Sequence, residues 1–214
     1  MQTMRRIGCL LIVVLSSAAF AQRTPTKSHE VWEPPDWSFP EDVKATVNRE
    51  MLSTLRISDY PIQLEETKLD DTGKHFGGTV GSKGDASEYE AWLCSHGADT
   101  GGRWVLWLES GEIDGGYVGS FQWRRLSTTA LIDKRCVALN HAPQLPLSLN
   151  LGMQAAEVLK TLGRPSWQSH GRLIYLHEHT KTIRGEPYDS SNIVTVHLRA
   201  GLVWAIAVSK TTSS

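Results

Sequence analysis

The chain has 214 residues, of which 40% are hydrophobic and 21% are charged, and its formal net charge is −1. This length allows one large domain or two small ones, and the composition is ordinary for a soluble globular protein. Because the charges are nearly balanced and no basic stripe stands out, we do not expect nucleic acid as a partner.

The N-terminus has the form of a secretory signal peptide. Arg5 and Arg6 precede an apolar run from Ile7 to Leu15, and Ala19-Phe20-Ala21 supplies a cleavage site with small residues. The apolar run is shorter than the roughly 20 residues that span a bilayer, which disfavours the alternative of an uncleaved anchor. We therefore expect residues 1–21 to be removed and the mature chain to be periplasmic or secreted, with no membrane span.

Two cysteines, Cys94 and Cys136, remain after this cleavage. An even pair in an exported protein favours a disulfide over a metal site. Two buried free thiols are the alternative, and we predict the disulfide.

The first half of the chain begins with a proline-rich stretch, residues 22–37, which we expect to be an extended leader. A serine, an early proline and two acids at Ser38–Asp42 are typical of a helix start, and the predicted helix continues to about Arg56. A second helix is predicted over Thr67–Gly77. Three strands are then predicted, at residues 87–94, 103–109 and 117–124.

A third helix is predicted over residues 127–140, where it would carry Cys136. If Cys94 lies on a strand, the disulfide would tie this helix to the sheet. The prolines at 143 and 146 indicate a linker over residues 140–148.

The second half, residues 149–210, has the clearest pattern. Apolar residues at helical spacing predict a helix from Gly152 to Gly163, with Asn150 as its N-cap and Gly163 as its end. Ala200-Gly201 predicts a hairpin between the last two of the strands that follow. These strands are predicted at residues 173–180, 192–199 and 202–210.

The two halves show the same order of elements. Thr67–Gly77 aligns with Met153–Gly163 at a constant offset of 86 residues, and three strands follow in each half. We interpret this as a divergent tandem repeat. The predicted fold class is therefore α+β, with two helix-plus-antiparallel-sheet units in tandem, at residues 38–140 and 149–210. The alternative is that a helix followed by a hairpin recurs by chance.

The run from Leu151 to Val158, continued by Leu162-Gly163-Arg164-Pro165 and the strand Leu173-Ile174-Tyr175, resembles the SmpA/OmlA (BamE-like) domain. Two such units in one exported chain resemble the tandem arrangement of the β-lactamase inhibitor protein family. The resemblance implies a module that binds other proteins through a sheet or loop surface and has no catalytic activity. The chain lacks the lipid-attached cysteine of the outer-membrane lipoproteins of the first family.

Glu109, Glu112 and Asp114 form a carboxylate-rich loop between two predicted strands. Three carboxylates among glycines could hold calcium or act as an acid–base pair. The spacing fits no EF-hand, however, and a hairpin turn requires glycine and aspartate in any case. The loop, with Tyr117 beside it, could also be a binding loop.

His177 and His179 are predicted to point to one face of their strand, where they could chelate zinc with His197 from a neighbouring strand. The alternative is that both are hydrogen-bonded or solvent-facing. No other metal signature is present, and we expect no cofactor.

The sequence contains eight tryptophans, and strand alternation places aromatic side chains on both faces of the predicted sheet. Trp107 and Trp123 could therefore display a binding surface. The alternative is that these rings fill the core beneath the helices.

Our leading functional prediction is an exported, non-catalytic module that binds an unidentified protein partner. The alternative is a small hydrolase or metal-dependent enzyme of the cell envelope. It would use the Glu109, Glu112 and Asp114 loop or the His177 and His179 pair. A structural accessory of the outer membrane is a third possibility.

Overall fold

The fold is described from a computed structural model, which describes residues 30–36, 39–40, 42–85, 88–169 and 171–213. The predicted signal peptide and the first part of the predicted leader lie outside these residues. In the described part of the chain, no helix is long and apolar enough to cross a membrane.

The described residues form strands, two α-helices and two short 3₁₀ helices. In chain order these are β1 (Thr54–Ile57), β2 (Tyr60–Gln63), α1 (Leu69–Phe76), β3 (Val80–Lys83), β4 (Glu90–Asp99), β5 (Gly102–Gly111), η1 (Glu112–Asp114), β6 (Ser120–Arg125), β7 (Val137–Ala138), η2 (Pro146–Ser148), α2 (Ala155–Leu162), β8 (Trp167–Ser169), β9 (Arg172–Ile183), β10 (Glu186–Arg199) and β11 (Leu202–Ser213).

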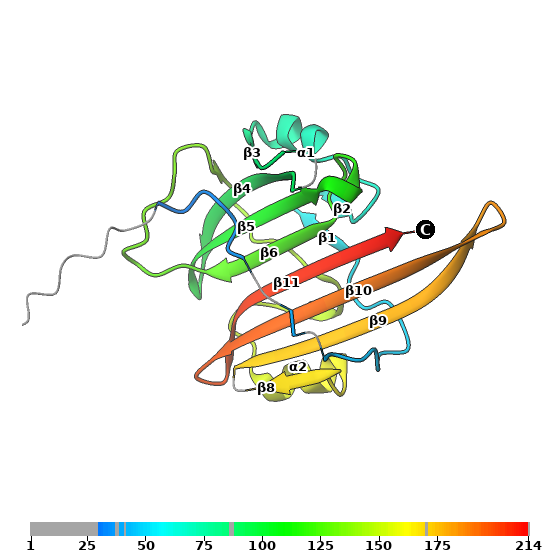
Figure 1. The fold of residues 1–214 in the computed structure, drawn as a ribbon. Coiled ribbons are helices and arrows are strands. Elements are labelled where there is room, and N and C mark those ends of the chain that lie inside the picture. The colour runs from blue at the N-terminus through cyan, green and yellow to red at the C-terminus, as the bar shows by residue number, and fades with distance from the viewer. Residues whose placement is uncertain (1–29, 37–38, 41, 86–87, 170, 214) are drawn as a thin grey trace, which may run out of the picture.

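Most of the strands belong to one continuous antiparallel sheet in the order β3-β4-β5-β6-β11-β10-β9-β8 (Figure 1). Within each half of the chain, neighbouring strands follow one another as a meander. The last strands of the two meanders, β6 and β11, pair in the middle of the sheet. In addition, β7 pairs with β4 in parallel, and β1 and β2 form a separate two-stranded sheet.

The predicted α+β class of two tandem units is wrong. The protein is mostly antiparallel sheet, with 49% strand and 12% helical residues and two α-helices among the described residues. The physical reason is the pairing of β6 with β11, where Phe121 lies opposite Val208 and Trp123 opposite Ile206. This pairing satisfies backbone groups that two separate units would leave at sheet edges, and it merges the strands into one sheet.

The strands of the second half confirm the prediction and extend it, because β9, β10 and β11 run beyond the predicted ends. Ala200 and Gly201 both have positive φ and form the two-residue turn of the predicted hairpin. Helix α2 ends at Gly163, as predicted. Its N-cap, however, is Gln154 and not Asn150, and the Glu157 carboxylate accepts a hydrogen bond from the Gln154 backbone N–H.

The helix predicted from Ser38 to Arg56 is wrong for the described residues 39–40 and 42–56, which contain only β1. Residues 42–53 instead form no helix or strand and lie against the sheet. The Val47 backbone N–H donates to the Leu176 carbonyl, and the Asn192 side chain bonds to the backbone of Leu52. These long-range partners replace the hydrogen bonds that a helix would have supplied.

The helix predicted over residues 127–140 is also wrong. The segment is irregular apart from β7, and the Arg103 guanidinium donates to the carbonyl oxygens of Thr128 and Ala130. The predicted linker is packed and not free, because Gln144 pairs with Arg56 and Leu145 is buried.

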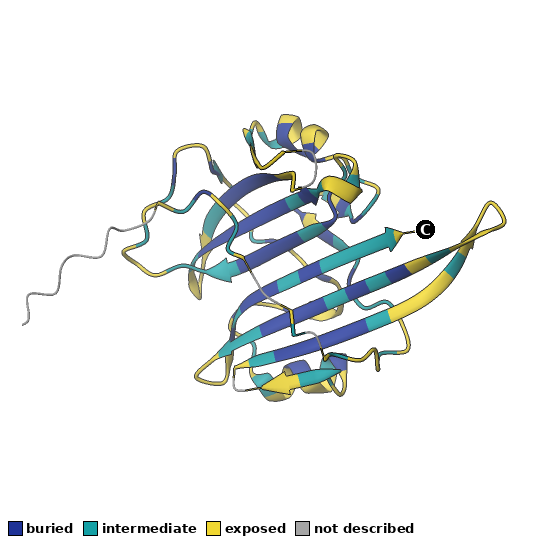
Figure 2. Cartoon of the chain, in the orientation of Figure 1, coloured by how far each residue is buried: buried dark blue, intermediate teal, exposed yellow. Residues whose placement is uncertain are grey.

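The main hydrophobic core lies on one side of the sheet, which we call the back face. The apolar residues of both helices, of β1 and β2, and of alternate sheet positions meet there; among them are Leu52, Leu69, Trp104, Trp123, Val158 and Val194. Figure 2 shows the buried residues concentrated in the central strands and the exposed ones at the turn between β9 and β10.

A second, smaller cluster lies on the opposite side, which we call the front face. It contains Trp32, Trp92, Trp107 and the predicted Cys94–Cys136 disulfide, whose two Cα atoms are 4.6 Å apart. The disulfide holds the segment before β7 against β4. The Trp107 indole donates to the Trp32 carbonyl at 2.9 Å, and this bond fixes the leader on the front face.

Candidate functional site

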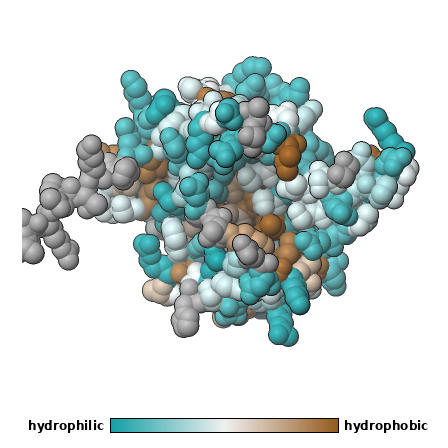
Figure 3. Space-filling model, in the orientation of Figure 1, coloured by the Kyte–Doolittle hydropathy of each residue, from teal (hydrophilic) through white to brown (hydrophobic). Residues whose placement is uncertain are grey.

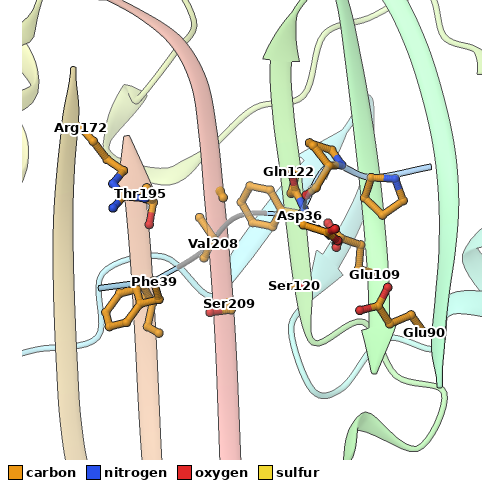
Figure 4. A pocket seen from close by; sticks show the side chains of 15 residues that line it. Asp36, Phe39, Glu90, Glu109, Ser120, Gln122, Arg172, Thr195, Val208 and Ser209 are labelled. Carbon is orange, nitrogen blue, oxygen red and sulfur yellow. Dashed lines mark hydrogen bonds between the residues drawn. The ribbon is translucent and has the colours of Figure 1, made fainter. Parts of the chain in front are cut away.

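A hollow of about 470 Å³ opens on the front face, across β5, β6, β11 and β10 (Figure 4). We call it the front hollow. Its volume lies within the range of small-ligand sites. Figure 3 shows apolar surface near the middle of this side of the molecule, with hydrophilic surface around it.

Small side chains make up much of the floor of the front hollow, beside Ile193. Ser120 on β6 lies opposite Ser209 on β11, and Ala207 on β11 lies opposite Thr195 on β10. Successive side chains of a strand alternate between the two faces, so these four point to the front. Their small size leaves open space where larger side chains would have covered the sheet.

The leader forms one side of the front hollow. Pro34, Pro35 and Asp36 line it, and Phe39 lines it further along the chain. The Gln122 side-chain amide donates to the Pro35 carbonyl at 3.1 Å, and this hydrogen bond fixes the leader backbone over β6.

Glu109 and Gln122 form the polar end of the front hollow. The Gln122 amide also donates to Glu109 Oε2 at 3.2 Å. The remaining side-chain oxygens, Glu109 Oε1 and Gln122 Oε1, are inaccessible to solvent and have no hydrogen-bond partner among the described residues. An unsatisfied buried polar atom costs about 1–3 kcal/mol, so two at one place call for an explanation.

The surroundings of Glu109 disfavour its ionised form. Burial raises the pKa of Glu109 to about 8, and the nearby carboxylates of Glu90 and Asp114 act in the same direction. The hydrogen bond from Gln122 and the charge of Lys83 oppose this shift and are outweighed. Part of the Glu109 side chain remains exposed, but its carboxyl group lies at the buried end. A raised carboxyl pKa in a hollow is characteristic of functional sites.

The two ends of the front hollow carry opposite charges. Asp36, Glu90 and Glu109 lie at one end, and Arg172 on β9 lies at the other (Figure 4). The Arg172 guanidinium is 5.0 Å from the centre of the Trp167 ring, a cation–π distance that helps to fix its position. Lys83 pairs with both Asp36 and Glu90, so part of the negative charge at the first end is already balanced.

In comparisons with protein-family models, curated proteins and solved structures, nothing matched this chain. The resemblance to the SmpA/OmlA (BamE-like) domain and to the β-lactamase inhibitor protein family thus stays a prediction. The site is argued below from its own geometry.

The structure divides the predicted carboxylate loop. Glu109 belongs to β5 and lines the front hollow, whereas Glu112 and Asp114 lie on η1. Asp114 accepts a hydrogen bond from the Gly111 backbone N–H at 2.6 Å and so closes the turn, while Glu112 is exposed. Tyr117 lies against the Lys68 ammonium, beside α1. Glu112, Asp114 and Tyr117 do not line the front hollow.

The predicted aromatic display on the sheet is wrong for Trp107 and Trp123, because both rings are fully buried. Trp123 fills the back-face core, and Trp107 lies beneath the Trp32 carbonyl on the front face. The Arg124 guanidinium covers Trp107, 4.8 Å from the centre of its ring. The alternative, that these rings fill the core beneath the helices, is confirmed for Trp123, whereas Trp107 is buried in the front-face cluster on the other side of the sheet.

The three histidines do not converge. His177 and His179 share one face, as predicted, with ring centres 4.9 Å apart, and the His177 Nδ1 bonds to the Val47 carbonyl. The register places His177 opposite Asn192 and His197 opposite Arg172, so His197 points to the other face. Among the described residues, no group of three or more His, Cys, Asp or Glu side chains is arranged to hold a metal ion.

The sequence analysis missed Gln122, Phe39 and the small floor residues. A signal was available in the alternation Ala205, Ala207 and Ser209, which gives one side of a long strand only small side chains. Such a run predicts a face against which another chain or ligand can lie closely.

Proposed function

We propose that this chain is an exported, non-catalytic binding protein that holds a partner protein in the front hollow. The observation that carries this proposal is the front hollow itself, which has a floor of small side chains and a polar end. At that end, two buried oxygens have no partner among the described residues. The partner would lie over the small side chains of the floor and against Gln122 and Glu109 at the polar end.

The signal-peptide pattern and the Cys94–Cys136 disulfide support export, because disulfides persist in oxidising compartments. The leader supports a role for the front face in recognition. The side chains of Trp107 and Gln122 already donate hydrogen bonds to its extended backbone, so this face is built to hold an extended chain.

A capture experiment with hollow-filling and control variants tests the proposal. Ala207→Trp places a large ring on the floor of the front hollow, whereas Leu159→Trp adds the same ring to an exposed position on α2. Envelope extract passed over the wild-type protein should yield a discrete partner. The Leu159→Trp protein should retain this partner, and the Ala207→Trp protein should lose it. Equal capture by both variants would overturn the proposal.

One observation favours the alternative of a hydrolase, namely the raised pKa of Glu109, which suits a general acid. In this account Glu109 would protonate a leaving group in the front hollow. Glu109→Gln would then abolish turnover of an envelope substrate and leave partner capture unchanged. In the binding account there is no turnover to lose, and Glu109→Gln weakens partner capture because Glu109 lines the front hollow.

A further inference from the structure

Three basic side chains lie in one row across the front face, where the register of the sheet brings them together. Arg124 on β6 lies opposite Ala205 on β11, and Ala205 lies opposite His197 on β10. His197 in turn lies opposite Arg172 on β9. Directly opposite residues of antiparallel strands share a face, so the row crosses four strands on one side of the sheet. It borders the front hollow, which Arg172 also lines.

A β-bulge adds Arg199 to this row, together with an aromatic ring that supports it. The pairing of β10 with β11 shifts between His197 and Leu198, and Trp204 has no residue of β10 opposite it. Such a bulge re-aims a side chain. The Trp204 ring meets the His197 ring edge-on at 5.8 Å, and the Arg199 guanidinium lies 4.9 Å from the centre of the Trp204 ring. Trp204 therefore lies on the front face. We call Arg124, His197, Arg172 and Arg199 the cationic row.

Each arginine of the cationic row lies over a tryptophan ring. The Arg124 guanidinium is 4.8 Å from the centre of the Trp107 ring, and the Arg172 guanidinium is 5.0 Å from the centre of the Trp167 ring. A guanidinium held over a ring face is fixed in position and keeps its N–H donors for other groups. The cationic row is thus positioned before any partner arrives.

The positive charge of the cationic row is not balanced locally. Within the described part of the chain, neither Arg124 nor Arg199 pairs with a carboxylate. Arg124 is half-buried and its burial lowers its pKa, whereas a carboxylate beside it would act in the opposite direction. Burial and the charge of Arg172 lower the pKa of His197 to about 4. At neutral pH His197 is therefore uncharged, and the three arginines supply the charge.

Charge and dimensions together select a short acidic segment as the ligand. The formal net charge of the whole chain is −1, so a large polyanionic surface such as a nucleic acid or an anionic membrane gains nothing beyond the cationic row. Arg124 and Arg172 are three strand spacings apart, which is about 14 Å. An extended chain covers about the same length in four residues. Carboxylates at positions i and i+4 of an extended segment therefore match these two arginines.

We propose that the cationic row binds an extended acidic segment of the partner protein, which crosses β6, β11, β10 and β9 beside the front hollow. The guanidinium groups of Arg124 and Arg172 donate to carboxylates at positions i and i+4 of the segment, and Arg199 adds a further positive charge. Paired hydrogen bonds between guanidinium and carboxylate are strong and directional. A guanidinium has five N–H donors, so Arg172 binds a carboxylate and keeps its other contacts. This inference rests on the proposed function, because the segment belongs to the partner.

The test uses two acetylated and amidated pentapeptides of equal charge and composition, Glu-Ser-Ser-Ser-Glu and Glu-Glu-Ser-Ser-Ser. NMR titration of the whole mature chain follows the Nε–H signals of Arg124, Arg172 and Arg199. We expect saturable binding of the first peptide, about 10-fold tighter than that of the second, because only the first reaches both Arg124 and Arg172. Raising the salt concentration to about 0.5 M should weaken this binding, since the charges are partly exposed.

Matched variants make the result specific. Arg199→Gln removes an exposed charge from the cationic row, whereas Arg184→Gln removes an exposed charge from the turn between β9 and β10, at the opposite end of both strands. The first variant should weaken the Glu-Ser-Ser-Ser-Glu peptide about 5-fold and the second should not. Arg124→Gln should weaken it about 10-fold. Because Arg199 is exposed, its variant keeps the test decisive even if Arg124→Gln does not fold.

Three results would overturn the proposal. The two peptides could bind equally, Arg199→Gln and Arg184→Gln could weaken binding by the same factor, or neither peptide could bind. Vesicles of phosphatidylglycerol are titrated in parallel. If they bind through the cationic row and the peptides do not, the row belongs to a membrane contact and the assignment to a protein segment is wrong.

The outcomes separate this inference from the proposed function. If Ala207→Trp abolishes partner capture but the Glu-Ser-Ser-Ser-Glu peptide does not bind, the binding function stands and the acidic-segment assignment fails. If the peptide binds as expected but Ala207→Trp leaves capture unchanged, the chemistry of the cationic row stands and the role of the front hollow in holding the partner fails.

Discussion

The Gln122 side-chain amide donates to one oxygen of Glu109, and its second N–H donates to the Pro35 carbonyl on the leader. One glutamine thus joins the carboxyl at the end of β5 to the chain segment that covers the sheet. The bond to Glu109 also limits the carboxyl to positions at the edge of the front hollow.

The first prediction concerns the stability of the protein between about pH 4.5 and pH 8. The pKa of Glu109 is raised to about 8 from an ordinary value of 4.5, so the unfolded chain loses this proton at lower pH than the folded protein. The stabilisation is fully present below pH 4.5 and is lost as the pH rises to 8. The free energy of unfolding should fall by at most about 1.4 kcal/mol per pH unit.

Urea unfolding at pH 6.5, 7.25 and 8 checks this. Wild-type protein should lose stability across this range, and Glu109→Gln, whose amide does not titrate, should lose much less. Glu112→Gln is the control and should follow the wild type. If the free energy of unfolding fell equally with pH in all three proteins, the burial of the Glu109 carboxyl would be contradicted.

A second prediction concerns the acid side. Burial, aided by the charge of Arg172, lowers the pKa of His197 to about 4 from 6.5. A lowered histidine pKa contributes stability above pH 6.5 that is lost as the pH falls to 4. Because the ring is partly exposed, the loss should be well below 1.4 kcal/mol per pH unit.

Unfolding of His197→Gln and wild-type protein between pH 6.5 and 4 measures this loss. As the pH decreases, the free energy of unfolding should fall less for the variant than for the wild type. His179→Gln, on the opposite face, serves as the matched control. A difference independent of pH would show that His197 accepts its proton freely in the folded state.

A third prediction concerns Asn192, which fixes residues 42–53 to the sheet. Its buried side chain accepts from the Met51 and Leu52 backbone N–H groups and donates to the Leu52 and Ser209 carbonyl oxygens. Asn192→Leu keeps the volume and leaves these backbone groups without their partner. We expect a loss of about 2–4 kcal/mol in the free energy of unfolding.

Calorimetry and limited proteolysis check this prediction. The Asn192→Leu variant should be cleaved within residues 42–53 under conditions that leave wild-type protein intact. Ser191→Ala, one position away on the opposite face, should change neither result. A variant as stable and resistant as wild type would show that this segment holds itself in place.

A fourth prediction concerns the Cys94–Cys136 disulfide, which closes a loop with a sequence separation of 42. In the chain-entropy account, removing such a crosslink destabilises the fold by about 4 kcal/mol. The Cys94→Ala/Cys136→Ala variant should unfold at lower urea concentration. Reductant should shift the wild type in the same direction and leave the variant unchanged. An unchanged midpoint for the variant would contradict the account.

The long strands of the second half could be predicted from the sequence because their signal is local. Apolar residues alternate along residues 173–180, 192–199 and 202–210, and Ala200-Gly201 supplies a two-residue turn. The single sheet could not be predicted in the same way. The register that joins β6 to β11 links residues more than 80 positions apart.

The segment that follows Ser38 shows how a local signal can mislead. The acids and proline at its start are typical of a helix, and Val47 and Leu52 fit a helical stripe. Both residues instead belong to an irregular segment that lies against the sheet. Leu52 is buried in the back-face core, and Val47 packs against that core. The hydrogen bonds of this segment come from Leu176, His177 and Asn192, more than 120 residues away in sequence.

The candidate site was predicted only in part. Glu109 was selected as a loop carboxylate, but its importance comes from burial beside Gln122, which depends on the pairing of β5 with β6. Phe39 enters the front hollow because the leader crosses the sheet, and composition alone does not show that path. The small residues of β11 were a second local sign of the site.

Site-specific photo-crosslinking in cells tests most directly whether the partner occupies the front hollow. A photoreactive phenylalanine at position 39 lies on the side of the front hollow, and the same group at Leu159 lies on exposed α2. The account predicts a discrete adduct from position 39 that disappears in an Ala207→Trp background, with no such adduct from position 159. The account is contradicted if no adduct forms from position 39, or if both positions give the same adduct.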